Sequence, residues 1–516
     1  MTANQLEAFV EKLRFVRQMD GPQALSQAVA DAEAQLGEQV RRLHYLSVPP
    51  RAAVSVIEML LVAGLVDRSR VIMEKPFGND LESAIRLNAK VHETFRESQI
   101  FRIDHLLGKE PAHNILAFRF AIGLFEPIWG RNFIHRVQID IPETLGLESR
   151  VDFYDATGAY RDMVVTHLQV LAFIAIEPRT ALEPRAIGEE KNKVFRSLMP
   201  IDPRNVVRGQ YDGYRDEDGV PTRSATETFI ALQCALDNWR WAGVPLYLRT
   251  GKRMAEGQRI VSIAFREAPK SMFPSNSGIG TKGPDHLTFD LADASRISLS
   301  VYGKRPGPGM RLEKLSMQFA TSETEEATDI LEAYERLILD TLRGDHTLFT
   351  TAEGIESLWE RSTPLLEDPP PVRPHAQGSW GPQCHPPAHR AKCVAAAVRA
   401  SLARAEIASW PASGRCDQEP VRSIRFARNS SIACCSLIRS RSICSIHGSC
   451  SASRHQNFGW RRNQRRASRL PISISTLMNC SSNSKNDSSS PRERCAEPSA
   501  RAITPKSTLR MPRRPP

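Results

Sequence analysis

The hydrophobic pattern of the first hundred residues alternates between short apolar runs and longer amphipathic stretches. Apolar runs predict strands at 43–48, 70–74 and 99–104. Helical spacing of apolar positions predicts helices at 24–41, at 51–66 and from Asn79 to Phe95. Asn79 with Glu82 three residues later is expected to start the last of these helices. Strands separated by helices of this length indicate βαβ units, so we expect a parallel sheet that is half of a doubly wound domain.

Beyond Ile122 the pattern changes to a succession of strands, many of them alternating and joined by short turns. The predicted strands are 136–141, 229–237, 245–250, 259–265, 286–291, 296–303 and 312–320. Such a succession favours a large antiparallel sheet, on which helices near 159–176 and 326–343 should pack. The predicted fold class is α/β plus α+β: an incomplete Rossmann-type parallel sheet (1–104), then a large antiparallel-sheet domain with helices (105–383), then a disordered tail.

Charge divides the chain at about residue 383. The whole chain has 69 Lys and Arg against 58 Asp and Glu, which by itself suggests a polyanion as a partner. Residues 384–516 hold 24 of the basic and 6 of the acidic residues, a net charge of +18, whereas 1–383 carry −7. The body therefore has the charge of an ordinary soluble enzyme, and the excess positive charge lies in the tail.

The tail, 384–516, shows no sustained apolar period and is predicted to be disordered. Three interpretations were weighed: an arginine- and serine-rich arm for nucleic acid, a metal-binding segment, and translation in the wrong reading frame. No CxxC or paired-His spacing supports metal. The abrupt change of composition favours the frame-shift interpretation, so we expect neither a metal site nor a nucleic-acid partner and assign the tail no function.

Several features bound the class of protein. Nine of the ten cysteines follow residue 383, which leaves Cys234 in the body and no disulfide framework. No apolar run is long enough to cross a bilayer and no signal peptide is seen, so we expect a cytoplasmic protein without a membrane partner. No G-x-G-x-x-G turn follows a strand in the first hundred residues. The first half of the doubly wound domain is therefore expected upstream of Met1, which would leave a sheet edge unpaired.

The sharpest motif is RIDHLLGKE at 102–110, which leaves the third predicted strand and opens a helix. An Asp-His pair followed by a Lys stands where open α/β sheets bind ligands. By itself such a cluster is more often a capping Asp with a surface His and Lys. His167, in the apolar stretch MVVTHLQVLAFIAI, would by itself be taken for a core histidine bonded to a carbonyl.

Other segments in the same order change that judgement. RIDHLLGKE resembles the active-site signature of glucose-6-phosphate dehydrogenases, and the family's other landmarks accompany it. They are HYLSVPP (44–50), EKPFG (74–78), ETLG (143–146), YRDMVVTHLQ (160–169), LRTGKR (248–253) and SWGP (379–382). The resemblance covers nearly all of 1–383. It implies oxidation of C1 of glucose 6-phosphate to a lactone with hydride transfer to NADP, in a chain truncated at its N-terminus.

The resemblance also implies roles for particular residues. His167 matches the general base, and Asp104 matches the carboxylate that orients it and stabilises its cation. His105 and Lys109 match phosphate-binding groups. Glu143, Asp162 and Lys252 match groups that contact the sugar, and Lys75 matches a lysine close to both substrate and nicotinamide. The family's members are expected to form homo-oligomers, either dimers or tetramers.

The sequence departs from the family pattern at two places. Leu106 stands where the family often has Tyr, so one phosphate contact is expected to be missing. Gly257 stands where a second basic residue often follows Lys252, and Arg259 is a weak candidate to replace it.

Alternatives to the family's enzyme were kept open. One is a different Rossmann-type sugar oxidoreductase, which RIDHLLGKE together with Asp162 and His167 disfavours. Another is a catalytically dead fragment, supported by the missing Gly-rich turn. A third is a scaffold with a basic nucleic-acid arm.

Overall fold

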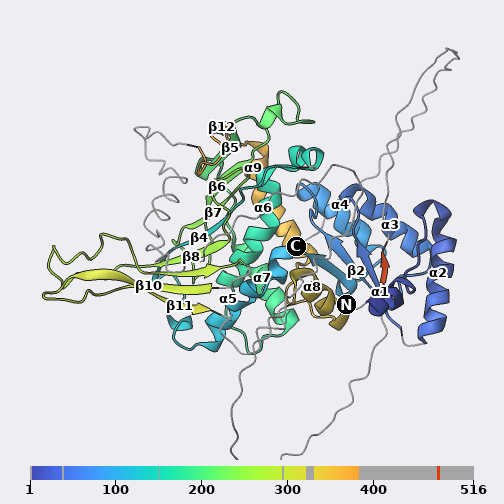
Figure 1. Cartoon of the computed structure of the whole chain (residues 1–516), viewed down its shortest axis with the longest axis horizontal. Coiled ribbons are helices and arrows are strands. Elements are labelled where there is room, and N and C mark those ends of the chain that lie inside the picture. Colours follow the sequence, from blue (N-terminus) through green and yellow to red (C-terminus); the bar gives the residue numbers. More distant parts are fainter. Residues whose placement is uncertain are drawn as a thin grey trace, which may run out of the picture. The chain divides into compact units, whose positions relative to one another are not determined.

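The computed structural model describes residues 3–37, 40–148, 150–292, 296–320, 331–382 and 474–476. A parallel sheet forms the N-terminal part, as the pattern predicted (Figure 1). Its strands are β1 (Arg42–Leu46), β2 (Ser69–Glu74) and β3 (Ile100–Ile103), with the order β1-β2-β3. The connecting helices are α3 (Pro50–Val62) and α4 (Leu81–His92), and α2 (Gly21–Leu36) precedes β1. A further helix, α1 (Ala3–Val10), was not predicted.

Two local predictions in this part were wrong. Helix α4 starts one residue later than expected, because Asp80 is its cap: the Asp80 carboxylate accepts from the Ser83 amide at 2.8 Å. Ser83, three residues after the cap, thus takes the part in the capping pair that was expected of Glu82. The outer edge of β1 is not bare either, since β13 (Ile474–Thr476) pairs in parallel with residues 43–45. Backbone groups of β1 therefore have partners on both sides.

The large sheet has nine strands in the described residues, in the order β11-β10-β9-β8-β4-β7-β6-β5-β12. They are β4 (Ile134–Pro142), β5 (Val206–Tyr211), β6 (Phe229–Cys234), β7 (Leu246–Gly251), β8 (Ile260–Phe265), β9 (His286–Asp290), β10 (Arg296–Lys304), β11 (Leu312–Ala320) and β12 (Val372–His375). The sheet is mixed and not purely antiparallel, because β4 pairs in parallel with β7 and β12 with β5. The sequence pattern missed β5 and β12. The partner of a strand and its direction depend on where the connecting segments lead the chain in the fold. The alternation of apolar and polar residues does not encode this.

Helices cover this sheet. They are α5 (Glu110–Ala121), α6 (Val151–Ala175), α7 (Pro184–Ser197), α8 (Ala333–Arg343) and α9 (Ala352–Glu367). Helix α5 starts at Glu110, where the motif at 102–110 was expected to open a helix, whereas α7 and α9 were not predicted. The predicted helix at 326–343 corresponds to α8, with 326–330 outside the described residues. Helix α6 begins earlier than predicted and is broken at Gly158, whose φ of +72° a glycine adopts without strain.

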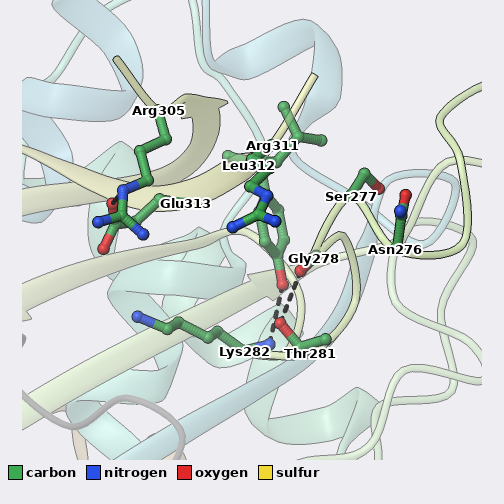
Figure 2. A pocket seen from close by; sticks show the side chains of 10 residues that line it. Asn276, Ser277, Gly278, Thr281, Lys282, Arg305, Arg311, Leu312 and Glu313 are labelled. Atoms are coloured by element: carbon green, nitrogen blue, oxygen red, sulfur yellow. Dashed lines mark hydrogen bonds and ion pairs between the residues drawn. The ribbon is translucent and has the colours of Figure 1, made fainter. Parts of the chain in front are cut away.

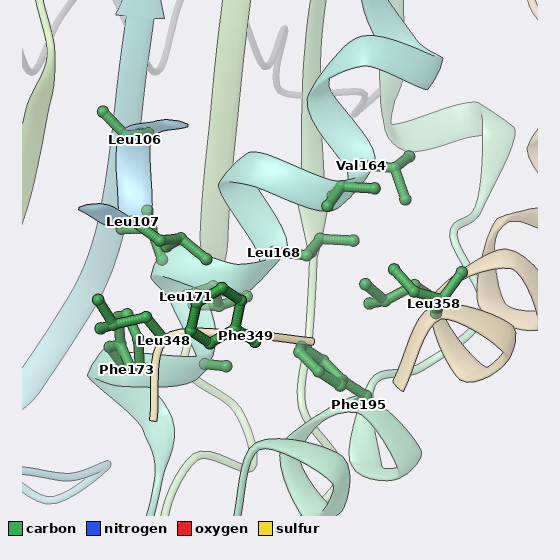
Figure 3. Close-up of a cluster of buried hydrophobic side chains, with 14 of the residues drawn as sticks. Leu106, Leu107, Val164, Leu168, Leu171, Phe173, Phe195, Leu348, Phe349 and Leu358 are labelled. Carbon is green, nitrogen blue, oxygen red and sulfur yellow. The ribbon is translucent and has the colours of Figure 1, made fainter. Parts of the chain in front are cut away.

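Helix α6 is the centre of the hydrophobic core. It lies against β6 and β7 on one side and against α5, α7 and α9 elsewhere (Figure 1). Val164, Leu168 and Leu171 point into a cluster with Leu107, Phe195 and Leu358 (Figure 3). A helix surrounded in this way needs apolar residues on all faces, which explains the run from Val164 to Ile176. Polar side chains within this run, such as His167, are removed from water by the same packing.

Described residues end at Pro382, apart from β13. The remainder of the tail, and so most of the segment predicted to be disordered, lies outside the described residues. The parallel sheet followed by the large sheet with helices confirms the predicted fold class.

Candidate active site

The candidate site forms where the carboxyl ends of β2 and β3 meet helix α6. Lys75 directly follows β2, and Asp104 directly follows β3. Their neighbouring strands run parallel, so both side chains emerge at the same edge of the sheet. The Lys75 ammonium lies 3.8 Å from the Asp104 carboxylate and 3.1 Å from that of Asp162, which comes from α6. Segments far apart in sequence thus bring one cation between two carboxylates.

Thr166 links these groups and was not singled out in the sequence. Its hydroxyl accepts a hydrogen bond from Lys75 at 3.0 Å and donates one to the Asp104 carboxylate. The other oxygen of Asp104 accepts from the Leu106 amide at 3.0 Å. Asp104 is only 3% exposed, so these bonds hold a buried carboxylate in one orientation. Thr166 directly precedes the candidate base His167, and this adjacency is the signal that the sequence offered. No motif spacing points to Thr166.

The charge of Lys75 governs the titration of its neighbours. Burial acts to raise the pKa of Asp162, but the ammonium of Lys75 outweighs burial and keeps that pKa below its usual range. Burial also acts to lower the pKa of Lys75, yet Asp104 and Asp162 together hold it above its ordinary value. Near neutral pH Lys75 is therefore an ammonium and Asp162 a carboxylate.

His167 is buried beside this cluster, with 3% of its surface exposed. Neither ring nitrogen makes a hydrogen bond to a described protein group, although the backbone of Arg249 lies close by. Burial, followed by the charge of Lys75, lowers its pKa to about 4, against the opposing influence of Asp162 and Asp104. A buried imidazole without a protein partner is costly, which indicates a site that a ligand's polar group completes. Asp104 and His167 are not hydrogen-bonded to each other.

A second group lies on the large sheet. Lys252 follows β7 and forms an ion pair with Glu143, which follows β4. Because β4 and β7 are parallel neighbours, their carboxyl ends bring the two side chains together. The ammonium of Lys252 also lies 5.6 Å from the centre of the Tyr154 ring. The charge of Lys252 acts on Asp162 and that of Glu143 acts on Lys75, so the two groups are adjacent.

His105 begins the 3₁₀ turn His105–Gly108 and is exposed, whereas the preceding Asp104 is buried. Burial lowers its pKa, and the charge of Lys109 lowers it further, with a smaller contribution from Arg259. These three basic residues are therefore near one another. The sequence had made Arg259 only a weak candidate for the site. The ring of Tyr334, from α8, packs against His105 with 5.1 Å between ring centres. Tyr334 was missed because it lies 229 positions from its neighbour.

The acid sensitivity of folding should depend on His167. An unfolded His titrates near pH 6.5, so between pH 6.5 and 4 the unfolded chain binds more protons than the folded one. The stability that depends on neutral His167 is complete above pH 6.5 and is lost as the pH falls towards 4. The shift corresponds to about 3 kcal/mol at most. We expect His167→Asn to lose less unfolding free energy than the parent between pH 7 and pH 4.5 in urea titrations. Equal losses would contradict a neutral, buried His167.

Two cavities lie away from these side chains. One of them, about 280 Å³, lies among residues 276–282 and the β10–β11 hairpin (Figure 2). Lys282, Arg305 and Arg311 line it, but Glu313 approaches Arg305 there at 4.0 Å. The described residues contain no group of three or more His, Cys, Asp or Glu placed to hold a metal ion. None of their helices is long and apolar enough to cross a membrane.

The fold and site define a class: an oxidoreductase with a nucleotide-binding parallel sheet and a second domain built on a large sheet. Two family models match the chain. The glucose-6-phosphate dehydrogenase NAD-binding domain matches residues 1–114, and the C-terminal domain of the same family matches 116–391. The chain belongs to the glucose-6-phosphate dehydrogenase family. Members of this family use NADP to oxidise glucose 6-phosphate.

Individual relatives agree. Glucose-6-phosphate 1-dehydrogenase of Rhizobium meliloti is 41% identical over 369 residues, which are 67% of this chain and 74% of that protein. A cytoplasmic enzyme of Arabidopsis thaliana is 37% identical, covering 74% of this chain and 77% of its own length. The crystal structure of the Mycobacterium avium enzyme has a TM-score of 0.63 at 36% identity, over 69% of this chain and 76% of that one. A glucose-6-phosphate dehydrogenase in complex with glucose 6-phosphate has a TM-score of 0.64 at 32% identity, over 72% and 78%.

The described residues fit one end of the NADP molecule. The carboxyl ends of β1 and β2 face the site, where the Tyr45 hydroxyl donates to Glu74 and Lys75 follows directly. Open parallel sheets bind the reactive ring of a dinucleotide at this edge, beside the substrate. None of the strands β1, β2 and β3 is followed by a Gly-rich turn, so we assign no residue to the cofactor's phosphates.

Proposed function

We propose that this site oxidises glucose 6-phosphate at C1, with His167 as the general base. The observation that carries the proposal is a buried imidazole whose two nitrogens have no hydrogen-bond partner within normal distance among the described residues, next to Lys75 and Asp162. A sugar hydroxyl placed there would supply the missing hydrogen bond, and its proton would pass to the imidazole. NADP, when bound, accepts the hydride from C1. The dead-fragment and other-oxidoreductase alternatives are not favoured, because the models of both domains of this family match the chain, at 1–114 and 116–391.

Asp104 is proposed to stabilise the imidazolium that forms. Its carboxylate is fixed by Thr166 and by the Leu106 amide, and its charge acts to raise the pKa of His167. A fixed negative charge near the base favours proton uptake as the hydride leaves. In the absence of substrate the pKa of His167 is low, so the imidazole by itself takes up a proton poorly. The negative charges of Asp104 and of the substrate's phosphate both favour the transfer of the proton to it.

The remaining groups are proposed to hold the sugar phosphate. His105 and Lys109 bind the phosphate, and Arg259 adds a third positive group close to His105. Glu143, Asp162 and Lys252 accept or donate hydrogen bonds at the sugar hydroxyls. Lys75 contacts both the sugar and the nicotinamide. Tyr334 packs on His105 and offers a hydroxyl in the neighbourhood where Leu106 has none.

The test of this function is direct. Purified chain is mixed with glucose 6-phosphate and NADP, and NADPH is followed by its absorbance. We expect NADPH to form with glucose 6-phosphate and much more slowly with glucose, because unphosphorylated sugar lacks the group that His105 and Lys109 bind. Reduction of NADP at equal rates with both sugars would contradict the proposed substrate.

We place the boundary between the two domains after Asp104, which follows the last strand of the small parallel sheet. We also propose that the protein is located in the cytoplasm.

A homo-dimer is proposed to form through the β10–β11 hairpin. Leu315, Met317 and Phe319 alternate along the edge strand β11, so they share one face, and each is about half exposed. Opposite them on β10 are Val301, Leu299 and Ile297. A second copy of this sheet would cover an apolar face that is unusually exposed for a soluble protein.

Phe319→Asp should therefore shift the protein from dimer towards monomer in sedimentation velocity. A charge in an apolar interface loses hydration without gaining a partner. Gln318→Asp is the matched control, because neighbouring residues of a strand point to opposite faces. An unchanged sedimentation coefficient for Phe319→Asp, at concentrations where the parent is dimeric, would contradict this interface.

A further inference from the structure

The break in helix α6 lies directly before the residues that act on the sugar. Helical geometry stops at Gly158 and resumes at Ala159, three residues before Asp162. The second half of the helix, 159–175, carries Asp162, Thr166 and His167. Its position along its own axis therefore sets where all three side chains stand. Something must hold its first turn, whose backbone amides have no partners within the helix.

Glu227 holds that first turn. Its carbonyl accepts from the Ala159 amide at 3.0 Å, and its side chain accepts from the Tyr160 amide at 3.0 Å. Its other carboxylate oxygen accepts two bonds from Arg208, at 2.6 and 3.1 Å. The Glu227 side chain is 5% exposed. A negative charge at this end of a helix is favourable, and the arginine compensates its burial.

The break itself is shaped around Glu227. A Cβ atom at Gly158 would stand 2.6 Å from the Glu227 carboxylate, closer than atoms can approach. A cavity of about 160 Å³ adjoins the break, lined by Arg161 and Arg208 among others. Arg208 donates two hydrogen bonds to Glu227, so the charge of the capping carboxylate is already balanced by the chain itself. The arrangement is a cap and not an anion site.

Residues on either side of Glu227 connect the cap to the sugar-binding strand. Thr226 donates its hydroxyl to the Asp155 carbonyl in the first half of α6, at 2.7 Å. The Thr228 carbonyl accepts from the Lys252 amide at 2.8 Å. The three residues 226–228 therefore bond to both halves of α6 and to the backbone of Lys252.

We propose that Glu227 is a positioning residue that sets the register of the second half of α6 against Lys252. This inference rests on the proposed function of His167, Asp162 and Lys252. Without the carboxylate, the first turn of this half-helix loses the Tyr160 bond and Arg208 loses its ion-pair partner. The helix would then shift or fray at its start. A displacement of about 1 Å at a catalytic centre can cost about a hundredfold in rate.

The test compares Glu227→Ala and Glu227→Gln with Glu126→Gln. Glu126 pairs with Arg119 at 3.0 Å and with Arg240 at 2.8 Å, and Arg119 donates to carbonyls at the other end of α6. Glu126→Gln therefore removes two ion pairs that support the other end of α6 without touching the site. We expect Glu227→Ala to lower kcat/KM for glucose 6-phosphate about a hundredfold, and Glu227→Gln less, because the amide keeps an acceptor for Tyr160. Glu126→Gln should lower the Tm by a similar amount and leave kcat/KM within twofold.

Amide exchange and calorimetry separate this inference from the proposed function. In Glu227→Ala, peptides covering 159–167 should exchange faster than in the parent, while those covering 168–176 should not change. Calorimetry should show weaker binding of glucose 6-phosphate in the same variant. Turnover, exchange at 159–167 and sugar affinity all equal to the parent would overturn the inference. If the parent itself did not reduce NADP, the proposed function would fail, and unchanged exchange and affinity would then overturn the positioning role by themselves.

Discussion

Replacing His167 by asparagine is expected to lower kcat by about 10²–10⁴-fold, the contribution typical of a positioned general base. Asparagine can still hydrogen-bond to a sugar hydroxyl, but it cannot take up the proton that leaves with the hydride. The KM for glucose 6-phosphate should change little, because the phosphate and most sugar contacts remain. Steady-state rates of NADPH formation over a range of sugar concentrations provide both constants.

A second buried histidine supplies the control. His44 is 4% exposed, and its Nε2 is paired with the Leu65 carbonyl at 2.9 Å. His44→Asn should cost stability but retain the turnover of the folded fraction. Should His167→Asn keep a kcat within threefold of the parent, the assignment of the base would be wrong. Asp104→Asn should also lower kcat, through loss of the charge that stabilises the imidazolium.

Replacing Lys109 by alanine is expected to raise the KM for glucose 6-phosphate by about 10- to 100-fold, because a hydrogen bond to a charged group is worth about 1.5–3 kcal/mol. The kcat should change much less, since the lost contact is with the phosphate and not with C1. Activity with unphosphorylated glucose, measured at high concentration, should be nearly unchanged.

Lys193→Ala is a suitable control for the loss of a lysine. Lys193 pairs with Glu190 on α7 at 2.8 Å, and its side chain is 55% exposed. Its replacement should change the kinetic constants for neither glucose 6-phosphate nor glucose. If Lys109→Ala weakened glucose and glucose 6-phosphate equally, Lys109 would not be a phosphate ligand. Arg259→Ala tests the weaker candidate in the same assay, with a smaller rise in KM expected.

The elements that the sequence determined are those with a clear local period. Strands β1, β2 and β3 and the helices between them follow from short apolar runs and amphipathic stretches, and most strands of the large sheet from alternation. The family also follows from sequence, because RIDHLLGKE and the ordered landmarks need no geometry. Helix α7 was missed because polar and charged side chains, such as Glu190 and Lys191, lie buried in it, bonded to distant groups.

Tertiary structure decided how the site residues are held. The sequence named Lys75, Asp104, Asp162 and His167 through the family's motifs, but not that Thr166 joins Lys75 to Asp104. It also gave no sign of Glu227, which is 67 positions from the amide that it caps. Likewise the parallel pairing of β4 with β7, which unites Glu143 and Lys252, depends on strands 109 positions apart. Local propensity acts over a few residues. The burial of a charge and the pairing of strand ends depend instead on which distant segments of the chain pack against each other.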